Sequence, residues 1–231
     1  MNSLVLGDIV FDPRRVIFVK SLKALVCAGL RESAQLSSIV ESLIETLEHY
    51  KAESLIVTGC SLSSTVLEAL REIQKKGVRV SLVSQKNADQ AVQNAEALGF
   101  EVHQELVWGK YRFVEVLEHG AVELYFVSAI GGSGEDELSY SVRVGRSGLG
   151  GIYLPVFLKG LGQVMLPSVN PACKRASVFR KSLSRYDVFA VGHHRVFPLG
   201  KVADLREVRT LGQIPLSPRT LGSKRYPTRE K

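Results

Sequence analysis

The sequence predicts an α/β fold, in which a half built of alternating strands and helices is followed by a run of antiparallel strands. Up to about residue 100, short apolar runs alternate with segments whose apolar residues repeat at helical spacing. Beyond that point, strand-like runs follow one another without a helical pattern between them. Hydrophobic residues make up 45% of the 231 residues and charged residues 23%, which is typical of a soluble globular protein with one full core.

An N-terminal hairpin is expected before the alternating half. Residues 3–11 and 15–20 are apolar and rich in β-branched side chains, and Asp12-Pro13-Arg14 between them suits a turn. Parallel strands buried on both faces are almost continuously apolar. Such runs are found at residues 22–28, 54–58 and 78–84, and helices are predicted at residues 33–50, 62–73 and 89–98. Together they predict a parallel βαβαβα unit with helices on the sheet faces.

The second half is predicted to consist of strands. Gly109-Lys110 suits a tight hairpin, and Gly192-His193-His194 joins the last two strands, so we interpret the two histidines as a turn pair rather than a metal pair. The strands are expected at residues 101–107, 111–117, 121–128, 139–144, 152–158, 163–166, 186–191 and 196–199.

A single domain is therefore predicted over residues 1–200. Residues 201–231 are rich in Pro, Lys and Arg and poor in large apolar side chains, which is typical of a disordered basic C-terminal tail.

The net charge of +7 is unevenly distributed along the chain. Residues 1–173 hold 16 Lys and Arg against 19 Asp and Glu, whereas residues 174–231 hold 14 against 4. This asymmetry favours a polyanionic partner, either nucleic acid or an anionic membrane. An equally weighted alternative is that the basic tail only keeps the protein in solution. The candidate nucleic-acid-binding residues are Lys174, Arg175, Arg180, Lys181 and Arg185 in the domain and Lys224 and Arg225 in the tail.

No apolar run reaches the length of a membrane span, and the N-terminus lacks the pattern of a secretory signal, so we expect a cytoplasmic location. Cys27, Cys60 and Cys173 are widely spaced and form no CxxC pair. This spacing argues against a disulfide framework and against a cysteine zinc site.

Three loops are the expected location of function, because ligands of parallel α/β sheets bind beyond the carboxyl ends of the strands. The loops read Ala28-Gly29-Leu30-Arg31-Glu32, Thr58-Gly59-Cys60-Ser61-Leu62 and Gln85-Lys86-Asn87-Ala88-Asp89. Here the sequence resembles the calcineurin-like metallophosphoesterases, whose corresponding loops carry Asp-x-His, Gly-Asp and Gly-Asn-His-Asp/Glu, followed by a later Gly-His-x-His. The resemblance covers roughly residues 4–200 and implies a metallophosphoesterase-like α/β/β/α sandwich.

The order of the segments is similar to that of one branch of this superfamily, the phosphoesterases associated with bacterial DNA-ligase damage-response clusters. In that branch an N-terminal hairpin comes first, and a Leu-Pro-x-Phe strand leads to a Leu-Pro-x-x segment. Leu154-Pro155-Val156-Phe157 and Leu166-Pro167-Ser168-Val169 stand at the corresponding places. The branch implies a DNA-repair protein as a partner.

The resemblance also implies a centre of two divalent metals such as Mn, but the family's ligands are largely replaced in this chain. The Asn of the third motif is kept, and an acid follows at its usual place. Elsewhere glycine, arginine, cysteine or alanine stands where the family has a carboxylate or an imidazole. In motif order, the corresponding positions are Gly29, Arg31, Cys60, Asn87, Ala88, Asp89, Arg146 and Gly148.

We therefore expect no metal cofactor and no hydrolysis, and interpret the chain as a pseudo-phosphoesterase that serves as a binding or scaffolding module for nucleic acid or a DNA-repair protein. Two-metal hydrolysis needs carboxylates and imidazoles around the cations, and Arg31 and Arg146 would repel them. A guanidinium binds phosphate directly. The backbone amides of Gly59-Cys60-Ser61, before a helix, are expected to add to such an anion site.

Two other functions stay open. In the first, the chain is an active phosphoesterase or nuclease, and its non-standard site uses Glu32, Asp89 and the acidic loop at residues 135–137. In the second, the basic end binds an acidic protein or a membrane surface.

The candidate site residues also have structural interpretations. Gly29 and Gly59 allow tight strand-to-helix turns. Cys60 is more often an inert, half-buried thiol than a nucleophile. Asn87 is a candidate N-cap of the third helix, and Asp89 is a favourable acid in its first turn.

Overall fold

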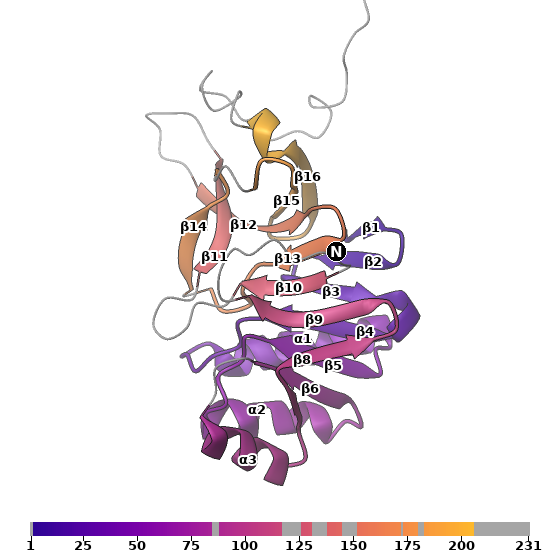
Figure 1. The fold of residues 1–231 in the computed structure, drawn as a ribbon, viewed down its shortest axis with the longest axis vertical. Helices are drawn as coiled ribbons and strands as arrows, with labels where there is room; N and C mark the ends of the chain where they lie inside the picture. The colour runs from indigo at the N-terminus through magenta and orange to yellow at the C-terminus, as the bar shows by residue number, and fades with distance from the viewer. Residues whose placement is uncertain are drawn as a thin grey trace, which may run out of the picture.

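The computed structural model describes residues 2–84, 88–116, 126–130, 138–144, 152–171, 173–179 and 183–205. These residues form two stacked β-sheets, with three helices packed on the outer face of the first sheet (Figure 1). The α/β class predicted from the sequence is confirmed, with layers in the order helices, first sheet, second sheet.

The first sheet has seven strands in chain order. They are β1 (Leu4–Leu6), β2 (Ile9–Asp12), β3 (Val16–Val19), β4 (Ala24–Ala28), β5 (Ser54–Thr58), β6 (Arg79–Val83) and β7 (Glu101–His103). Strands β1 to β4 pair antiparallel, and β4 to β7 pair parallel. The connections are a 3₁₀ turn, η1 (Lys20–Leu22), before β4, and the helices α1 (Leu36–Tyr50), α2 (Ser64–Gln74) and α3 (Asp89–Ala97) between the parallel strands. The predicted βαβαβα unit is therefore present.

The central parallel strands β4, β5 and β6 are largely apolar because each of their faces is buried against a different layer. In β4, Leu25 and Cys27 face the helices, whereas Val26 and Ala28 face the second sheet. The helices meet the sheet with one apolar stripe each, which in α2 includes Val66 and Leu70. One sheet face is thus covered by helices and the other by strands.

The second sheet has nine strands. They are β8 (Glu105–Trp108), β9 (Tyr111–Val116), β10 (Phe126–Ile130), β11 (Leu138–Val144), β12 (Ile152–Lys159), β13 (Gln163–Leu166), β14 (Lys174–Ser177), β15 (Asp187–Val191) and β16 (Val196–Lys201). The order is β14-β11-β12-β13-β10-β9-β8, and β15 pairs with β12 and β16. Most pairs are antiparallel as expected, but β9 with β10, β10 with β13, and β11 with β14 are parallel.

Three elements differ from the sequence prediction. Residues 3–11 form two strands rather than one, because Gly7 turns the chain with a positive φ of 62°. Residues 101–107 are divided at Gln104, where the chain leaves the first sheet as β7 and enters the second as β8. Lys174–Ser177, which has no apolar alternation, is a strand because β11 offers it a parallel partner.

Aromatic side chains fill the layer between the two sheets. The Phe11 ring lies 5.1 Å from Phe157 and 5.2 Å from Phe189, measured between ring centroids. A third apolar cluster covers the far side of the second sheet and includes Val202 and Leu205, both fully buried. Packed structure thus continues a few residues past position 200. Residues 206–231, with Lys224 and Arg225, lie outside the described part of the chain.

Candidate functional site

The three predicted loops begin at the carboxyl edge of the parallel strands. At each strand end, the next backbone amide donates to the neighbouring strand: Gly29 N to Thr58 O at 2.9 Å, Gly59 N to Val83 O at 3.0 Å, and Ser84 N to His103 O at 2.9 Å. The loops therefore start at the same level along the sheet. We call this side of the molecule the carboxyl edge and the opposite side the amino edge.

Gly29 and Gly59 serve the turns that begin the first two loops. Their φ angles are 70° and 63°, in the left-handed region that residues with a Cβ rarely adopt. Both positions thus have a structural reason to be glycine. An aspartate at position 29, as in the family's first motif, would be strained in this backbone conformation.

Cys60 points away from the edge, into the core between the first sheet and the helices. Its side chain is 4% exposed and packs in the same apolar cluster as Leu30 and Leu62. The thiol donates to the carbonyl of Ser61 at 3.3 Å. This burial agrees with an inert structural thiol.

The prediction that the backbone amides of residues 59–61 form an anion site is wrong for two of the three amides. The Gly59 amide bonds to Val83, and the Ser61 amide donates to the Leu30 carbonyl at 3.0 Å. Both N–H groups donate to backbone carbonyls of neighbouring segments, so neither is available to a phosphate.

Arg31 and Glu32 follow at the end of the first loop. Arg31 is partly buried, and Glu32 is exposed. The Glu32 carboxylate accepts a hydrogen bond from Thr65 Oγ1 at 3.0 Å, in the first turn of α2. An acid at a helix N-terminus is stabilised there, so Glu32 has a structural role that accounts for its position.

The third loop leads directly into α3. The N-cap of this helix is Ala88, with extended φ and ψ of −61° and 141°, so the prediction that Asn87 is the N-cap is wrong by one residue. Asp89 is exposed in the first turn, as expected. Asn87, Arg146 and Gly148 lie outside the described residues.

The described positions of the motif do not fit a two-metal centre. Gly29 and Ala88 have no donor atom in their side chains, Arg31 is a cation, and Cys60 faces the core. Over the described ranges, no group of three or more His, Cys, Asp and Glu side chains is placed to hold a metal ion.

A buried carboxylate at this edge was missed by the sequence analysis. Glu115 of β9 is 6% exposed, and its Oε2 accepts from Ser84 Oγ at 3.1 Å, just beyond the end of β6. It sits in an otherwise strand-like run, so no local pattern distinguishes it.

The turn between β2 and β3 was also missed as a functional element. Because β3 runs antiparallel to β4, its start lies beside the end of β4, and Arg14 and Arg15 reach the carboxyl edge. Asp12, 1% exposed, shapes the turn: its Oδ1 accepts from Arg14 N at 2.8 Å, and its backbone oxygen accepts from Arg15 N at 3.1 Å. Tyr50 supports the same carboxylate through a 2.8 Å hydrogen bond to Oδ2.

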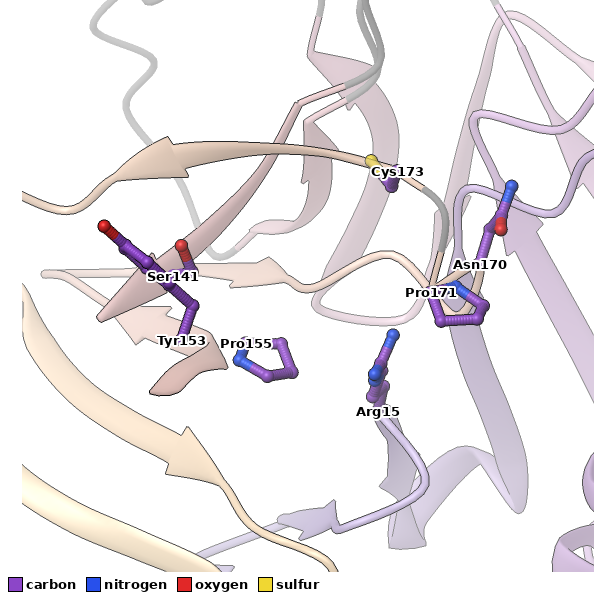
Figure 2. Close-up of a pocket in the computed structure, with 7 residues that line it drawn as sticks. All are labelled: Arg15, Ser141, Tyr153, Pro155, Asn170, Pro171 and Cys173. Atoms are coloured by element: carbon purple, nitrogen blue, oxygen red, sulfur yellow. The ribbon is translucent and has the colours of Figure 1, made fainter. Parts of the chain in front are cut away.

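Both arginines of this turn are held by the surrounding structure. Arg14 Nη2 lies 3.4 Å from Glu45 Oε2 on α1. Arg15, which has a positive φ of 66°, donates from Nη1 to the carbonyl of Ser168 at 3.3 Å. A pocket opens beside Arg15 toward β11 and β12, and Figure 2 shows the guanidinium extending into it.

The remaining predicted residues lie in the second half of the chain. His193 and His194 are exposed in the β15–β16 turn with their ring centroids 4.0 Å apart, as expected of a turn pair. Lys174 and Arg175 belong to β14, and Arg185 is exposed before β15. Arg180 and Lys181 lie outside the described residues.

Comparison with known proteins gives a likeness of fold. No family model and no curated protein matches this sequence. Among the described residues, no helix is long and apolar enough to cross a membrane. The crystal structure of the Pseudomonas putida nuclease MPE matches with a TM-score of 0.61 and 16% sequence identity, over 86% of this chain and 100% of that chain. The chain therefore has a metallophosphoesterase-like fold, shared with a nuclease.

Proposed function

We propose that this chain is a phosphoesterase-fold protein that binds nucleic acid without hydrolysing it. The observation that carries the proposal is the placement of Cys60. The resemblance puts the family's bridging carboxylate at this position, but the side chain lies in the helix-side core, 4% exposed. From there it cannot help to hold a cation at the carboxyl edge, where a phosphate would approach.

The charges of the edge support a nucleic-acid partner. Arg14, Arg15 and Arg31 come from two adjacent segments of the edge, and guanidinium groups bind phosphate without a metal. The carboxylates nearby contact protein groups: Glu32 contacts Thr65, Glu115 contacts Ser84, and Glu45 pairs with Arg14. The shared fold with a nuclease agrees with this partner class.

Finer assignments follow from the resemblance and are part of the proposal. They are a cytoplasmic pseudoenzyme without a metal cofactor, a DNA-repair protein as a second partner, and a contribution to nucleic-acid binding from the basic C-terminal quarter. Truncation after Leu205, which keeps the buried Val202 and Leu205, tests the contribution of the residues beyond it, since loss of phosphate contacts reduces the salt dependence of binding.

Metal content and turnover test the absence of hydrolysis. The purified full-length chain, incubated with Mn²⁺, is expected to retain no stoichiometric metal and to leave a chromogenic phosphodiester uncleaved. Stoichiometric Mn, Fe or Zn together with turnover would overturn the proposal.

Fluorescence anisotropy of a labelled oligonucleotide tests binding. Arg31→Gln is expected to weaken binding and to lower the salt slope by about one unit, because one phosphate contact is lost. Arg79→Gln, the same change at an exposed arginine of the amino edge, is the matched control and should bind like the wild type. Equal affinities of all three proteins would exclude Arg31 from the interface.

The burial of Glu115 is a specific observation in favour of the enzymatic alternative. The buried Glu115 carboxylate accepts from Ser84, which lines a pocket together with Asp89, and such a group could serve an active phosphoesterase or nuclease with a non-standard site. Turnover that is abolished by Glu115→Gln, in a variant that unfolds like the wild type, would establish this alternative in place of the binding module.

A further inference from the structure

An apolar groove lies at the amino edge, between the C-terminal ends of α1 and α2. Both helices pack on the outer face of the first sheet (Figure 1), and the groove opens where they lead into β5 and β6. Its volume is about 530 Å³, within the roughly 300–1,000 Å³ range of small-ligand sites. Its described lining residues come from residues 44–52 and 73–78, so the groove lies on the side of the sheet opposite to the three loops.

The floor of the groove is apolar and well packed. Leu47 and Ile73 are 3% and 0% exposed, and Ala52 is 9% exposed. Ile44 and Val78 are partly buried and pack against the same core cluster. An apolar chain that lies in the groove would therefore lose contact with water, which is expected to raise affinity by roughly two- to fourfold for each methylene group buried.

The groove exists because of the way in which α1 ends. Lys51 has a left-handed φ of 51°, and the next amide, Ala52 N, donates back to Leu47 O at 2.9 Å. Helices that end in this manner commonly place a larger apolar side chain at the position of Ala52, in contact with the residue at the position of Leu47. The methyl group of Ala52 is too short to fill that space, so the floor stays open to a ligand.

The mouth of the groove carries a surplus of positive charge among its described residues. Lys76 Nζ lies 2.8 Å from Glu48 Oε1, in an ion pair that joins the ends of the two helices. The ammonium of Lys51, on the same rim, forms no ion pair with any residue that the structure describes. A ligand with an anionic group next to an apolar part would match both the floor and the rim.

We propose that this groove binds an apolar molecule that ends in a carboxylate, with its apolar part on Leu47 and Ile73 and its carboxylate at Lys51. A medium-chain fatty acid is the simplest member of this class. Such binding goes beyond the proposed function and does not depend on it, because the groove and the proposed nucleic-acid interface lie at opposite edges of the sheet.

Titration calorimetry of the full-length chain with decanoate tests the proposal. Saturable one-to-one binding is expected, and removal of each methylene group, in nonanoate and then octanoate, should weaken it by roughly two- to fourfold. Decylammonium, which has the same chain and the opposite charge, should bind several-fold more weakly. Equal affinities of decanoate and decylammonium, or affinities independent of chain length, would overturn the proposal.

Two charge variants of the rim have opposite expected effects. Lys51→Gln removes the cation and should weaken decanoate binding by about two- to threefold. Glu48→Gln removes the neighbouring carboxylate, releases Lys76 and should strengthen binding by about the same factor. The matched control Lys20→Gln, at an exposed lysine of the amino edge outside the groove, should bind like the wild type. Effects of the same sign in both rim variants would exclude a carboxylate ligand.

Ala52→Leu distinguishes a defined site from adsorption to apolar surface. The larger side chain fills the groove, so decanoate binding should fall by at least about tenfold, whereas adsorption would increase with the added apolar area. If Ala52→Leu fails to fold, Val78→Thr carries the test, because a hydroxyl in place of a methyl group on the wall should weaken binding by about two- to fourfold. Unchanged or increased affinity in the folded variant would overturn the site.

Sedimentation velocity of the chain without ligand tests a second copy as the occupant of the groove. A monomer is expected for both the wild type and Ala52→Leu. A dimer that Ala52→Leu dissociates would show that another copy covers the groove, and it would overturn the proposal.

Discussion

The two edges of the parallel sheet use charged residues differently. At the amino edge, Lys76 lies 2.8 Å from Glu48, and Lys23 pairs with Glu53, so cations and anions stand in exposed couples. At the carboxyl edge, arginines are found at the β2–β3 turn and after β4; Arg14 pairs with Glu45 of α1, and Glu32 accepts a hydrogen bond from Thr65.

The difference distinguishes an edge of exposed ion pairs from the edge where we propose that nucleic acid binds. The amino edge joins the two sheets through Asp8, whose carboxylate accepts from Ser21 N at 2.9 Å and from Tyr111 Oη at 2.6 Å. At the carboxyl edge, the buried Asp12 holds the backbone of the turn that carries Arg14 and Arg15. Substitutions at the amino edge should therefore leave nucleic-acid binding unchanged, whereas those at the carboxyl edge should change it.

The largest effect is expected for Cys60→Asp, which restores the residue type of the family's motif. The new carboxylate would lie in an apolar core, so we expect a loss of about 3 kcal/mol or more in the free energy of unfolding. Urea denaturation measures the loss, with Cys60→Ser as the control of similar size. A folded Cys60→Asp protein that gains a bound Mn²⁺ would show that position 60 reaches the edge after all.

The second effect is expected for Asp12→Ala, at the support of the β2–β3 turn. The change leaves Arg14 N and Tyr50 Oη without their acceptor, and we expect a loss of about 2 kcal/mol. Oligonucleotide affinity should fall together with stability, because the arginine turn loses its anchor. In Asp12→Asn the acceptor for Arg14 is kept, so a smaller loss is expected. Full affinity in a destabilised Asp12→Ala protein would exclude the turn from the interface.

The fold was largely predictable because its strands and helices carry strong periodic signals. Residues 54–58 and 163–166 are strands with the predicted bounds, and α1 and α3 each lie within the predicted helix. Strand partners were not predictable, since the apolar pattern of β10 is the same whether its neighbours run parallel or antiparallel. The sheet change at Gln104 was also missed, although three consecutive polar residues, His103, Gln104 and Glu105, interrupt the apolar alternation there.

The candidate site was predictable where it follows from the ends of parallel strands. The three loops lie at one edge because β4, β5 and β6 pair in register. The direction of Cys60 and the use of the Gly59 and Ser61 amides depend on how the loops bond to each other. Arg15 meets Ser168 across 153 positions of sequence, a contact that no local pattern encodes.

The third effect concerns the amino edge and depends on pH. Burial raises the pKa of Asp8, but hydrogen bonds from Ser21 and Tyr111 outweigh it and hold this pKa below the ordinary value of 3.8. Asp8→Ala should cost about 1 kcal/mol near neutral pH. Because the folded-state pKa is lowered, this contribution is present above the ordinary carboxyl pKa and is lost as the pH falls through the folded value.

Urea denaturation of wild type and Asp8→Ala between pH 7 and pH 2 measures this difference. Tyr111→Phe is the matched control, since it removes one of the hydrogen bonds and keeps the carboxylate. Oligonucleotide affinity should be unchanged in both variants. A difference in stability that stays constant down to pH 2 would contradict a role for the ionised carboxylate.

The smallest effect is expected for Lys76→Gln and Lys23→Gln, which remove the exposed ion pairs of the amino edge. Their side chains are 49% and 61% exposed, so solvent screens the pairs, and each change should alter the free energy of unfolding by less than about 0.5 kcal/mol. Nucleic-acid affinity and its salt slope should match those of the wild type, because the phosphates are bound at the other edge. Arg31→Gln, with the same loss of one positive charge, should weaken binding. If the lysine variants lowered affinity as much as Arg31→Gln does, net charge rather than the carboxyl edge would determine binding.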